Sequence, residues 1–457
     1  MITLSLSQIA AALNGQLVGD DITINAVSTD SRAFTGDGLF IALKGERFDA
    51  HNFAASAVDN GAKALLVEKQ LDVSVPQIVV NNSHTALGEL GALVRKIVAP
   101  ISVALTGSNG KTSVKEIVAT ILSQQFQVLF TAGNFNNDIG VPLTLLRLTQ
   151  GDQYGVFELG ANHKGEIDYT SHLVQPTVAL VNNIGSAHLE GFGSVEGIAH
   201  AKAEIFNHLA EDGVAIINAD DAFCDFMLDK TAAYKQLTFS RDSAVDADVS
   251  ASDIQPDDNG CYQFTLKYLS QTAEVKLPLA GIHQVSNALA ASAICLALGL
   301  DIAKIISGLS QLQPVKGRMM PITFGRFVVV DDSYNANPSS VGVAINWLQQ
   351  RDHYRCLVLG DLGELGDNAP LLHEQLGQQA KQANIDALFC CGTLSASASQ
   401  AFGCPHYADI TELSAALIKQ LNQLPGQATI LVKGSRSAAM ERVIDKLSDA
   451  FGRGELV

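Results

Sequence analysis

Residues 106–113 carry the clearest chemical signal in this chain, the string Thr-Gly-Ser-Asn-Gly-Lys-Thr-Ser. An apolar run over 101–105 predicts a buried strand before it, and residues 113–124 predict a helix after it. A strand, a glycine turn and a helix N-terminus form a phosphate cradle, because backbone N–H groups and the positive helix end face the anion. The fuller pattern has a glycine where Leu105 stands, so this is a shortened nucleotide-binding loop. The loop residues expected to contact nucleotide are Gly107, Ser108, Asn109, Gly110, Lys111, Thr112 and Ser113.

Polar residues after other predicted strands could complete the site, since ligands of open α/β sheets bind at the carboxyl ends of strands. Glu158 ends an apolar run, and its carboxylate could join Thr112 around Mg²⁺; a solvated glutamate explains the pattern equally well. His188 lies in a loop after a strand, where it could be a metal ligand or a hydrogen-bond donor, although lone loop histidines more often have neither role. Lys202 lies on an alanine-rich helix, and its spacing alone indicates a solvated cation.

The second half of the chain adds candidate contacts to nucleotide and substrate. Gln284 and Asn287 lie three apart on a predicted helix, where amides can contact an adenine edge or merely cap the helix. The guanidinium of Arg318 could reach a γ-phosphate. Asp332 ends a strand and could bind ribose hydroxyls, and residues 433–436 form a second anion site, suited to a carboxylate. No nucleophile triad is evident, so the chemistry indicated is phosphoryl transfer by positioning and charge.

Three α/β units are predicted to position these groups. Residues 1–84 predict a small mixed α/β domain. Residues 85–312 alternate strands and helices, which predicts a P-loop ATPase-like domain with a mostly parallel sheet and an antiparallel hairpin within 246–278. Residues 313–457 predict a smaller, Rossmann-like domain, and a helix over 86–97 links the first domain to the second.

Composition restricts the class of partner. The chain of 457 residues is 47% apolar and 17% charged, so it can bury proper cores. Its formal net charge of -17 argues against nucleic acid. Seven scattered cysteines without a C-x-x-C pair indicate unpaired thiols in a reducing cytosol. No signal peptide and no membrane-spanning run are visible, so we expect a soluble cytoplasmic protein, by default a monomer.

Taken together, these residues resemble the Mur ligases over nearly the whole chain. The shared family elements are 106–113, Glu158, His188, Lys202, Gly281-x-His283 with Asn287, Gly317-Arg318 and Asp332. Longer strings resemble the members that add D-alanyl-D-alanine, and they are 42–51, 131–142, 158–162, 187–192, 332–338, 360–366 and 433–436. Two positions depart from the family pattern: Gln284 stands where Asn is common, and Ala50 where Gly is common.

The resemblance implies an ATP-dependent ligase that forms a carbon–nitrogen bond through an acyl phosphate. D-alanyl-D-alanine would be added to a UDP-N-acetylmuramoyl-tripeptide, which completes the cytoplasmic pentapeptide precursor of peptidoglycan for the cell wall. ATP and two Mg²⁺ ions are the cofactors implied. Whether the third residue of the tripeptide is lysine or meso-diaminopimelate stays open.

Residue roles follow from the same resemblance. Catalytic roles are implied for Lys111, Glu158, His188, Lys202 and Arg318, with Lys202 carbamylated. Thr112, Glu158, His188 and Lys202 would hold metal, and Asn287, Arg318 and Asp332 would contact adenine, γ-phosphate and ribose. Substrates would be bound by Ser28, Asp30, Ser31, Arg32, Lys44, Arg47, Phe48, Asp49, His51, Asn134, Asn137, Asn335, Asn337, Lys433, Ser435 and Arg436. The first domain would take the UDP-sugar, and the third would help to hold the dipeptide.

Two alternatives remain at this point. Another amide ligase of the superfamily could add a different amino acid, or glutamate to folate, but the strings at 48–51, 334–338 and 433–436 speak against it. A nucleotide-binding regulatory protein without turnover is the second alternative, although the chain retains Lys111, Glu158, His188 and Lys202. Phosphate release with each candidate acceptor would separate the three.

Overall fold

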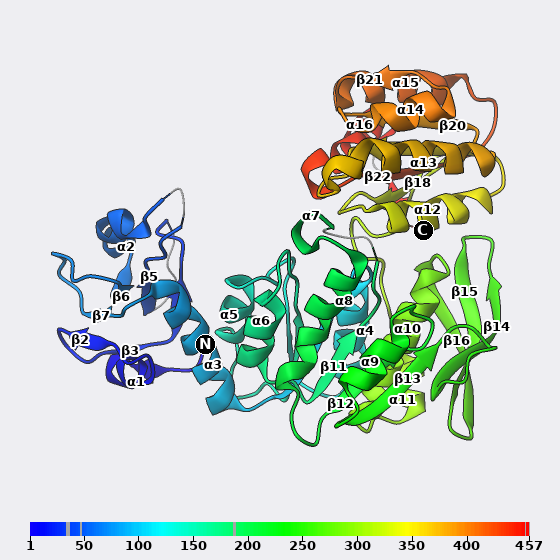
Figure 1. Cartoon of the computed structure of the whole chain (residues 1–457). Coiled ribbons are helices and arrows are strands. Elements are labelled where there is room, and N and C mark those ends of the chain that lie inside the picture. Colours follow the sequence, from blue (N-terminus) through cyan, green and yellow to red (C-terminus); the bar gives the residue numbers. More distant parts are fainter. Residues whose placement is uncertain (33–36, 46–47, 186–188, 453, 457) are drawn as a thin grey trace.

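The computed structural model has three α/β units that follow one another along the chain (Figure 1). It describes residues 1–32, 37–45, 48–185, 189–452 and 454–456. In the view of Figure 1 the first unit lies to the left of the central one, and the third unit lies above the right half of the central one. Each unit has its own sheet, with mostly parallel strands, which confirms the predicted fold class. Among the described helices, none is both long and apolar enough to cross a bilayer.

The first unit is built on a sheet of order β2-β7-β6-β5-β4, in which only β2 is antiparallel to its neighbour. Leu39, Leu65 and Leu66 are fully buried, as expected for strands covered on both faces. A two-stranded ribbon of β1 and β3 and the long helix α3 complete the unit. The bounds are β1 Leu4–Ser5, α1 Leu6–Ala12, β2 Gln16–Val18, β3 Thr23–Ile24, β4 Ala26–Ser28, β5 Gly38–Ile41, α2 Ala54–Asp59, β6 Ala62–Val67, β7 Gln77–Val79 and α3 Ser83–Val98.

The central unit has a sheet of order β16-β15-β14-β13-β12-β11-β8-β10-β9. Its strands are parallel from β14 to β9, and β15 and β16 are antiparallel, so the predicted hairpin is confirmed. Its strands are β8 Ile101–Thr106, β9 Val128–Phe130, β10 Tyr154–Glu158, β11 Val178–Val181, β12 Val214–Asn218, β13 Lys235–Ser240, β14 Val249–Pro256, β15 Cys261–Tyr268 and β16 Gln271–Ala280. Its helices are α4 Lys111–Ser123, α5 Gly140–Leu145, α6 Glu166–Val174, α7 Leu189–Phe192, α8 Val195–Ala203, α9 Cys224–Lys230, α10 His283–Ala297 and α11 Ile302–Leu309.

The third unit has a sheet of order β21-β20-β19-β22-β18-β17-β23, parallel from β21 to β18 and antiparallel at β17 and β23. Its strands are β17 Met320–Phe324, β18 Phe327–Asp332, β19 Tyr354–Gly360, β20 Ala387–Cys391, β21 His406–Tyr407, β22 Ala428–Lys433 and β23 Glu455–Leu456. Its helices are α12 Pro338–Gln349, α13 Ala369–Gln382, α14 Ala396–Phe402, α15 Ile410–Gln423 and α16 Glu441–Phe451.

Successive side chains of β8 point to opposite faces of the sheet, so the apolar core of the central unit has two layers. Val103 and Leu105 pack on one face with α4 and α10, and Ala104 packs on the other. The second layer continues through α3 into the first unit, where it includes Leu87 and Leu90. The first and central units therefore share one apolar core.

The β14–β15 turn supports the third unit. Arg351, just after α12, donates through Nη1 to the carbonyl of Asp258 at 3.2 Å, and Tyr262 donates to Gln350 at 3.4 Å. Gly260 has φ +76°, and a Cβ there would clash with the side chains of Trp347 and Arg351. Only glycine fits this close approach, so the turn is a point of close contact between the central and third units.

An ion pair at the start of α3 should make the stability of the first two units depend on pH. His84 Nε2 lies 2.8 Å from Asp138 Oδ2, and this hydrogen bond raises the pKa of His84 while it lowers that of Asp138. A histidine whose pKa is higher in the folded than in the unfolded protein stabilises the fold at pH values below the unfolded-state pKa. This stabilisation is lost as the pH rises through the folded-state pKa. Both side chains are partly exposed, so the contribution should be under about 1 kcal/mol.

We expect wild-type protein to lose this increment between about pH 6 and about pH 8.5, and His84→Gln to lack the loss. Urea unfolding of both proteins at the two pH values measures it. An equal pH dependence in the two proteins would contradict the assignment.

Candidate active site

A cavity of about 580 Å³ lies between the carboxyl edge of the central sheet and the third unit. The central unit contributes the loops after β8, β9, β10, β11 and β12 and the start of α10. The third unit contributes Arg318, Asp332, Asn337 and Lys433. The cavity therefore lies where ligands of open α/β sheets bind.

The phosphate loop has the backbone that its sequence predicts. Gly107 and Gly110 have φ of +153° and +78°, and α4 begins at Lys111 without a side-chain cap. The first N–H groups of α4 are therefore available to an anion at the positive helix end. Lys111 Nζ donates to the carbonyl of Gly107 at 2.7 Å. Burial lowers the pKa of Lys111, an effect that Glu158 opposes and Arg318 reinforces.

Two asparagines that follow β11 hold the loop in this shape. The backbone N–H of Asn109 donates to Asn183 Oδ1 at 2.8 Å, and Asn183 Nδ2 donates to the carbonyl of Asn109 at 3.0 Å. Asn182 Nδ2 donates to the same carbonyl at 2.9 Å. Sequence analysis did not assign them, although a polar pair directly after an apolar strand was a usable signal. The loop is thus pre-organised before nucleotide arrives.

Thr112 and Glu158 meet at the start of α4, as the metal prediction requires. Thr112 Oγ1 donates to Glu158 Oε2 at 2.8 Å, and Arg318 Nη2 donates to Thr112 Oγ1 at 2.7 Å. Asn136 Nδ2 donates to the other oxygen, Oε1, at 2.8 Å. A hydroxyl and a carboxylate are hard oxygen donors, so they suit Mg²⁺ beside a phosphate. In the part of the chain that the structure describes, no three His, Cys, Asp or Glu side chains cluster as a metal site, and His188 lies outside those residues.

Lys202 is buried on α8 with 1% of its surface exposed. Burial, and next the positive charge of Lys111, lower its pKa well below the ordinary lysine value. Nothing in the described segments forms a hydrogen bond or ion pair with its ammonium group, and Lys202 does not line the cavity. The prediction from spacing alone, that Lys202 is a solvated surface cation, is therefore wrong.

The amides predicted to contact adenine partly satisfy one another. Asn287 Nδ2 donates to Gln284 Oε1 at 2.9 Å, and Asn287 Oδ1 accepts from Asn182 at 3.2 Å. Asn287 also packs so closely against Gly110 that a Cβ there would clash with it. His283 lines the same end of the cavity, its Nδ1 has no partner among the described residues, and burial lowers its pKa to about 4. A neutral ring at this position is a candidate contact for the base.

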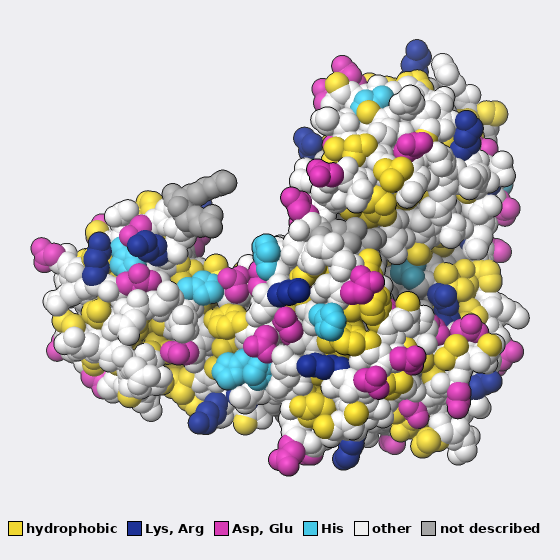
Figure 2. All heavy atoms as spheres, viewed as in Figure 1, with side chains coloured by type: hydrophobic (Ala, Val, Ile, Leu, Met, Phe, Trp, Pro, Cys, Tyr) yellow, Lys and Arg dark blue, Asp and Glu magenta, His cyan; other side chains and the backbone are white. Residues whose placement is uncertain are grey.

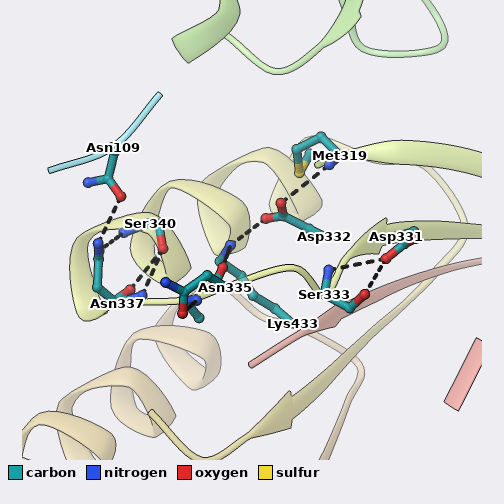
Figure 3. Close-up of polar contacts among 10 residues, drawn as sticks. Asn109, Met319, Asp331, Asp332, Ser333, Asn335, Asn337, Ser340 and Lys433 are labelled. Carbon is teal, nitrogen blue, oxygen red and sulfur yellow. Dashed lines mark hydrogen bonds and ion pairs between the residues drawn. The ribbon is translucent and has the colours of Figure 1, made fainter. Parts of the chain in front are cut away.

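Asp332 and Lys433, predicted to bind different ligands, form one ion pair (Figure 3). Lys433 Nζ lies 2.6 Å from Asp332 Oδ2 and also donates to the carbonyl of Asn335 at 3.3 Å. The side chain of Lys433 is only 3% exposed. Such a pair is buried and charge-neutral, so each group would have to serve its ligand while bound to the other.

Asn337 connects the third unit to the phosphate loop. Its Nδ2 donates to Asn109 Oδ1 at 2.8 Å, and its Oδ1 caps α12 by accepting from the N–H of Ser340 at 2.9 Å. With the bond from Arg318 to Thr112, the described residues form two direct hydrogen bonds between the third unit and the loop. The orientation of the third unit is therefore coupled to the loop that would hold phosphate.

The remaining third-unit candidates lie directly after β18 and β22. Arg436 Nη2 pairs with Glu441 at 2.7 Å, and its N–H donates to Asn335 Oδ1 at 3.2 Å. Ser435 Oγ donates to the carbonyl of Asp361 at 2.6 Å and does not line the cavity. On the central side, Asn134 and Asn137 line the cavity.

The first-unit candidates lie away from this cavity. Figure 2 shows the first and third units separated by a wide hollow above the central unit. His51 is buried, with Nδ1 against Asp49 at 2.5 Å and Nε2 accepting from the N–H of Glu68 at 2.8 Å, so both ring nitrogens serve the fold. Phe48 is 59% exposed. Arg47 lies outside the described residues.

The other first-unit candidates form a small polar cluster and one antiparallel backbone bridge. Arg32 and Asp30 form an exposed pair at 2.6 Å, and Ser28 Oγ accepts from the N–H of Asp30 at 3.0 Å. The backbone carbonyl of Ser31 accepts a hydrogen bond from Asn60 Nδ2 at 2.8 Å. The backbones of Lys44 and Asp49 form an isolated antiparallel β-bridge.

Three family models match successive parts of the chain. Residues 23–101 match the Mur ligase family catalytic domain, 105–295 the Mur ligase middle domain, and 317–436 the Mur ligase glutamate ligase domain. The chain is 48% identical to the UDP-N-acetylmuramoyl-tripeptide--D-alanyl-D-alanine ligase of Escherichia coli, over 98% of this chain and 99% of that protein.

Solved structures show the same similarity. The chain is 40% identical to MurF from Acinetobacter baumannii, with a TM-score of 0.93 over 98% of this chain and 99% of that one. It is 28% identical to MurF ligase from Thermotoga maritima, solved in complex with ADP, with a TM-score of 0.83 over 93% of this chain and 98% of that one.

Proposed function

This chain belongs to the Mur ligase family, and we propose that it adds D-alanyl-D-alanine to a UDP-N-acetylmuramoyl-tripeptide with conversion of ATP to ADP and phosphate. Similarity to ligases with this activity extends over 98% of the chain and through all three units. One observation carries the chemistry: Lys111 and the start of α4 lie beside Thr112 and Glu158, and Arg318 reaches them from the third unit. This arrangement is suited to binding a nucleoside triphosphate.

In the proposed reaction the terminal carboxylate of the tripeptide attacks the γ-phosphorus of ATP, and ADP leaves. The amine of D-alanyl-D-alanine then attacks the acyl carbon, forms the peptide bond and expels phosphate, while the amine loses a proton. The first step brings an anionic carboxylate to an anionic triphosphate, so the main physical obstacle is repulsion. Lys111, Arg318 and the N–H groups of α4 offset that charge. Bound magnesium would further neutralise the phosphate oxygens.

The remaining roles follow the same scheme. Thr112 and Glu158 would hold one magnesium, and His188 with a carbamylated Lys202 would hold a second. Asn287, His283 and Asp332 would bind the nucleoside, the first unit the UDP-sugar, and Lys433, Ser435 and Arg436 the dipeptide. Closure of the open hollow would bring the first and third units together and exclude water from the acyl phosphate. We further propose a cytoplasmic monomer.

Phosphate release tests this function. Release should require ATP, the nucleotide tripeptide and D-alanyl-D-alanine together, because the acyl phosphate turns over only when an amine captures it. The tripeptide should be offered with lysine and with meso-diaminopimelate, and glutamate with folate serves as the rival pair. Release with the rival pair, or none with any acceptor, would contradict the proposal.

A further inference from the structure

Lys115 is fully buried, and the reaction described above does not use it. It lies on α4 one turn after Lys111. Its Nζ donates to the carbonyl of Thr131 at 2.6 Å, pairs with Glu116 Oε1 at 2.9 Å and lies 5.6 Å from the ring centre of Phe130. Burying an ammonium group costs free energy unless hydrogen bonds and an opposite charge compensate for the lost water. The burial of Lys115 at this position therefore suggests a specific role.

Thr131, which accepts this hydrogen bond from Lys115, is itself fully buried and directly follows β9. Its N–H donates to the carbonyl of Val156 at 3.0 Å. Its carbonyl accepts from Lys115, and its Oγ1 accepts from the N–H of Glu158 at 3.0 Å. Thr131 therefore connects a buried cation on α4 to the end of β10.

Glu158 needs this support because it lies beyond the regular ladder on that side. The pairing of β9 with β10 ends at Phe130 and Val156, two residues before Glu158. The Thr131 hydroxyl takes the place of the next ladder carbonyl. Five residues farther along the same loop, Asn136 holds one carboxylate oxygen of Glu158, while Thr112 holds the other.

We propose that Lys115 and Thr131 are positioning residues that aim the Glu158 carboxylate at the metal. The proposal rests on the proposed function, in which Glu158 is a magnesium ligand. Lys115 fixes the backbone of Thr131, Thr131 fixes the backbone of Glu158, and the loop that starts at Thr131 brings Asn136 to the carboxylate. Groups behind a metal ligand commonly alter metal affinity by about 10-fold to 100-fold when removed, because a ligand must be held to a fraction of an ångström.

Mn²⁺ binding to the enzyme–ADP complex, followed by the paramagnetic resonance of free Mn²⁺, tests this without turnover. Thr131→Val keeps the shape and removes the acceptor, and Lys115→Met keeps the buried chain and removes the donor. Each should raise the Kd for Mn²⁺ by about tenfold. Thr131→Ser restores a hydroxyl and should stay within about twofold of wild type. Glu116→Gln is the matched control for the Kd for Mn²⁺, which it should leave at the wild-type value. It removes the charge pair with Lys115 and leaves the hydrogen bond from Lys115 to Thr131.

A solely structural role would lower thermal stability in Thr131→Val and leave the Kd for Mn²⁺ at the wild-type value, and that result would overturn the proposal. Should Lys115→Met fail to fold, the comparison of Thr131→Val with Thr131→Ser decides. The proposed function fails separately, when wild-type enzyme binds Mn²⁺ and ADP yet releases no phosphate with D-alanyl-D-alanine.

Discussion

Lys111→Ala should abolish turnover, with a loss of kcat/KM of about 10³-fold or more. Lys111 is held inside the phosphate loop by its bond to the carbonyl of Gly107, where its charge would face the phosphates of bound ATP. Alanine keeps the first turn of α4 and removes that charge from the point where the transferred group becomes most anionic. ADP release in the presence of both substrates measures the loss.

Stability separates this effect from misfolding. Burial lowers the pKa of Lys111, which means that the charged ammonium group destabilises the folded protein. Lys111→Ala should therefore unfold at no lower temperature than wild type. Lys230→Ala, which alters an exposed lysine at the end of α9, is the matched control and should retain full activity. Wild-type ADP release from Lys111→Ala would remove the phosphate role of this loop.

Lys202→Ala should be largely inactive, and short carboxylates such as acetate should restore part of the activity. Lys202 is buried without a partner among the described residues, and its lowered pKa favours the neutral amine. A neutral amine can attack carbon dioxide, which forms an N–C bond and releases a proton. The resulting carbamate is an anion that can bind metal. Removing it should lower kcat by about 100-fold, and phosphate release with and without acetate measures both effects.

Lys202→Met provides the control for rescue. Methionine fills the space that alanine leaves, so acetate should restore nothing. Full activity of Lys202→Ala without any added carboxylate would exclude the carbamate. Mass spectrometry of the wild-type protein under carbon dioxide, with the adduct trapped by alkylation, checks the modification independently of turnover.

Much of the fold follows from local patterns. The apolar run over 101–105 predicted β8, and the run that ends at Glu158 is β10, because strands buried on both faces carry few polar residues. Strand β13, Lys235–Ser240, was missed since its exposed, polar start hides the pattern. The antiparallel edge strands β17 and β23 were also missed, because they are short or bounded by weak turn signals.

The candidate site was predictable where chemistry depends on neighbours in sequence. The string 106–113 determines a glycine turn and a helix start by itself, since positive φ at Gly107 and Gly110 is a local property. Pairings between distant residues were not predictable. Asp332 and Lys433 were assigned to different ligands, yet β18 and β22 are paired in register at these two residues, which places the two charges together.

The sequence alone thus determined the nucleotide loop, the three units and the family, because these depend on local conformation and on the order of motifs. The tertiary structure alone decided which side chains meet. Three asparagines follow Gly133, and only the fold shows that Asn136 is the one that holds Glu158. Only the pairing of Glu158 with Leu105 brings that carboxylate beside Thr112. Side chains of one type are equivalent in a sequence, and strand register and burial distinguish them.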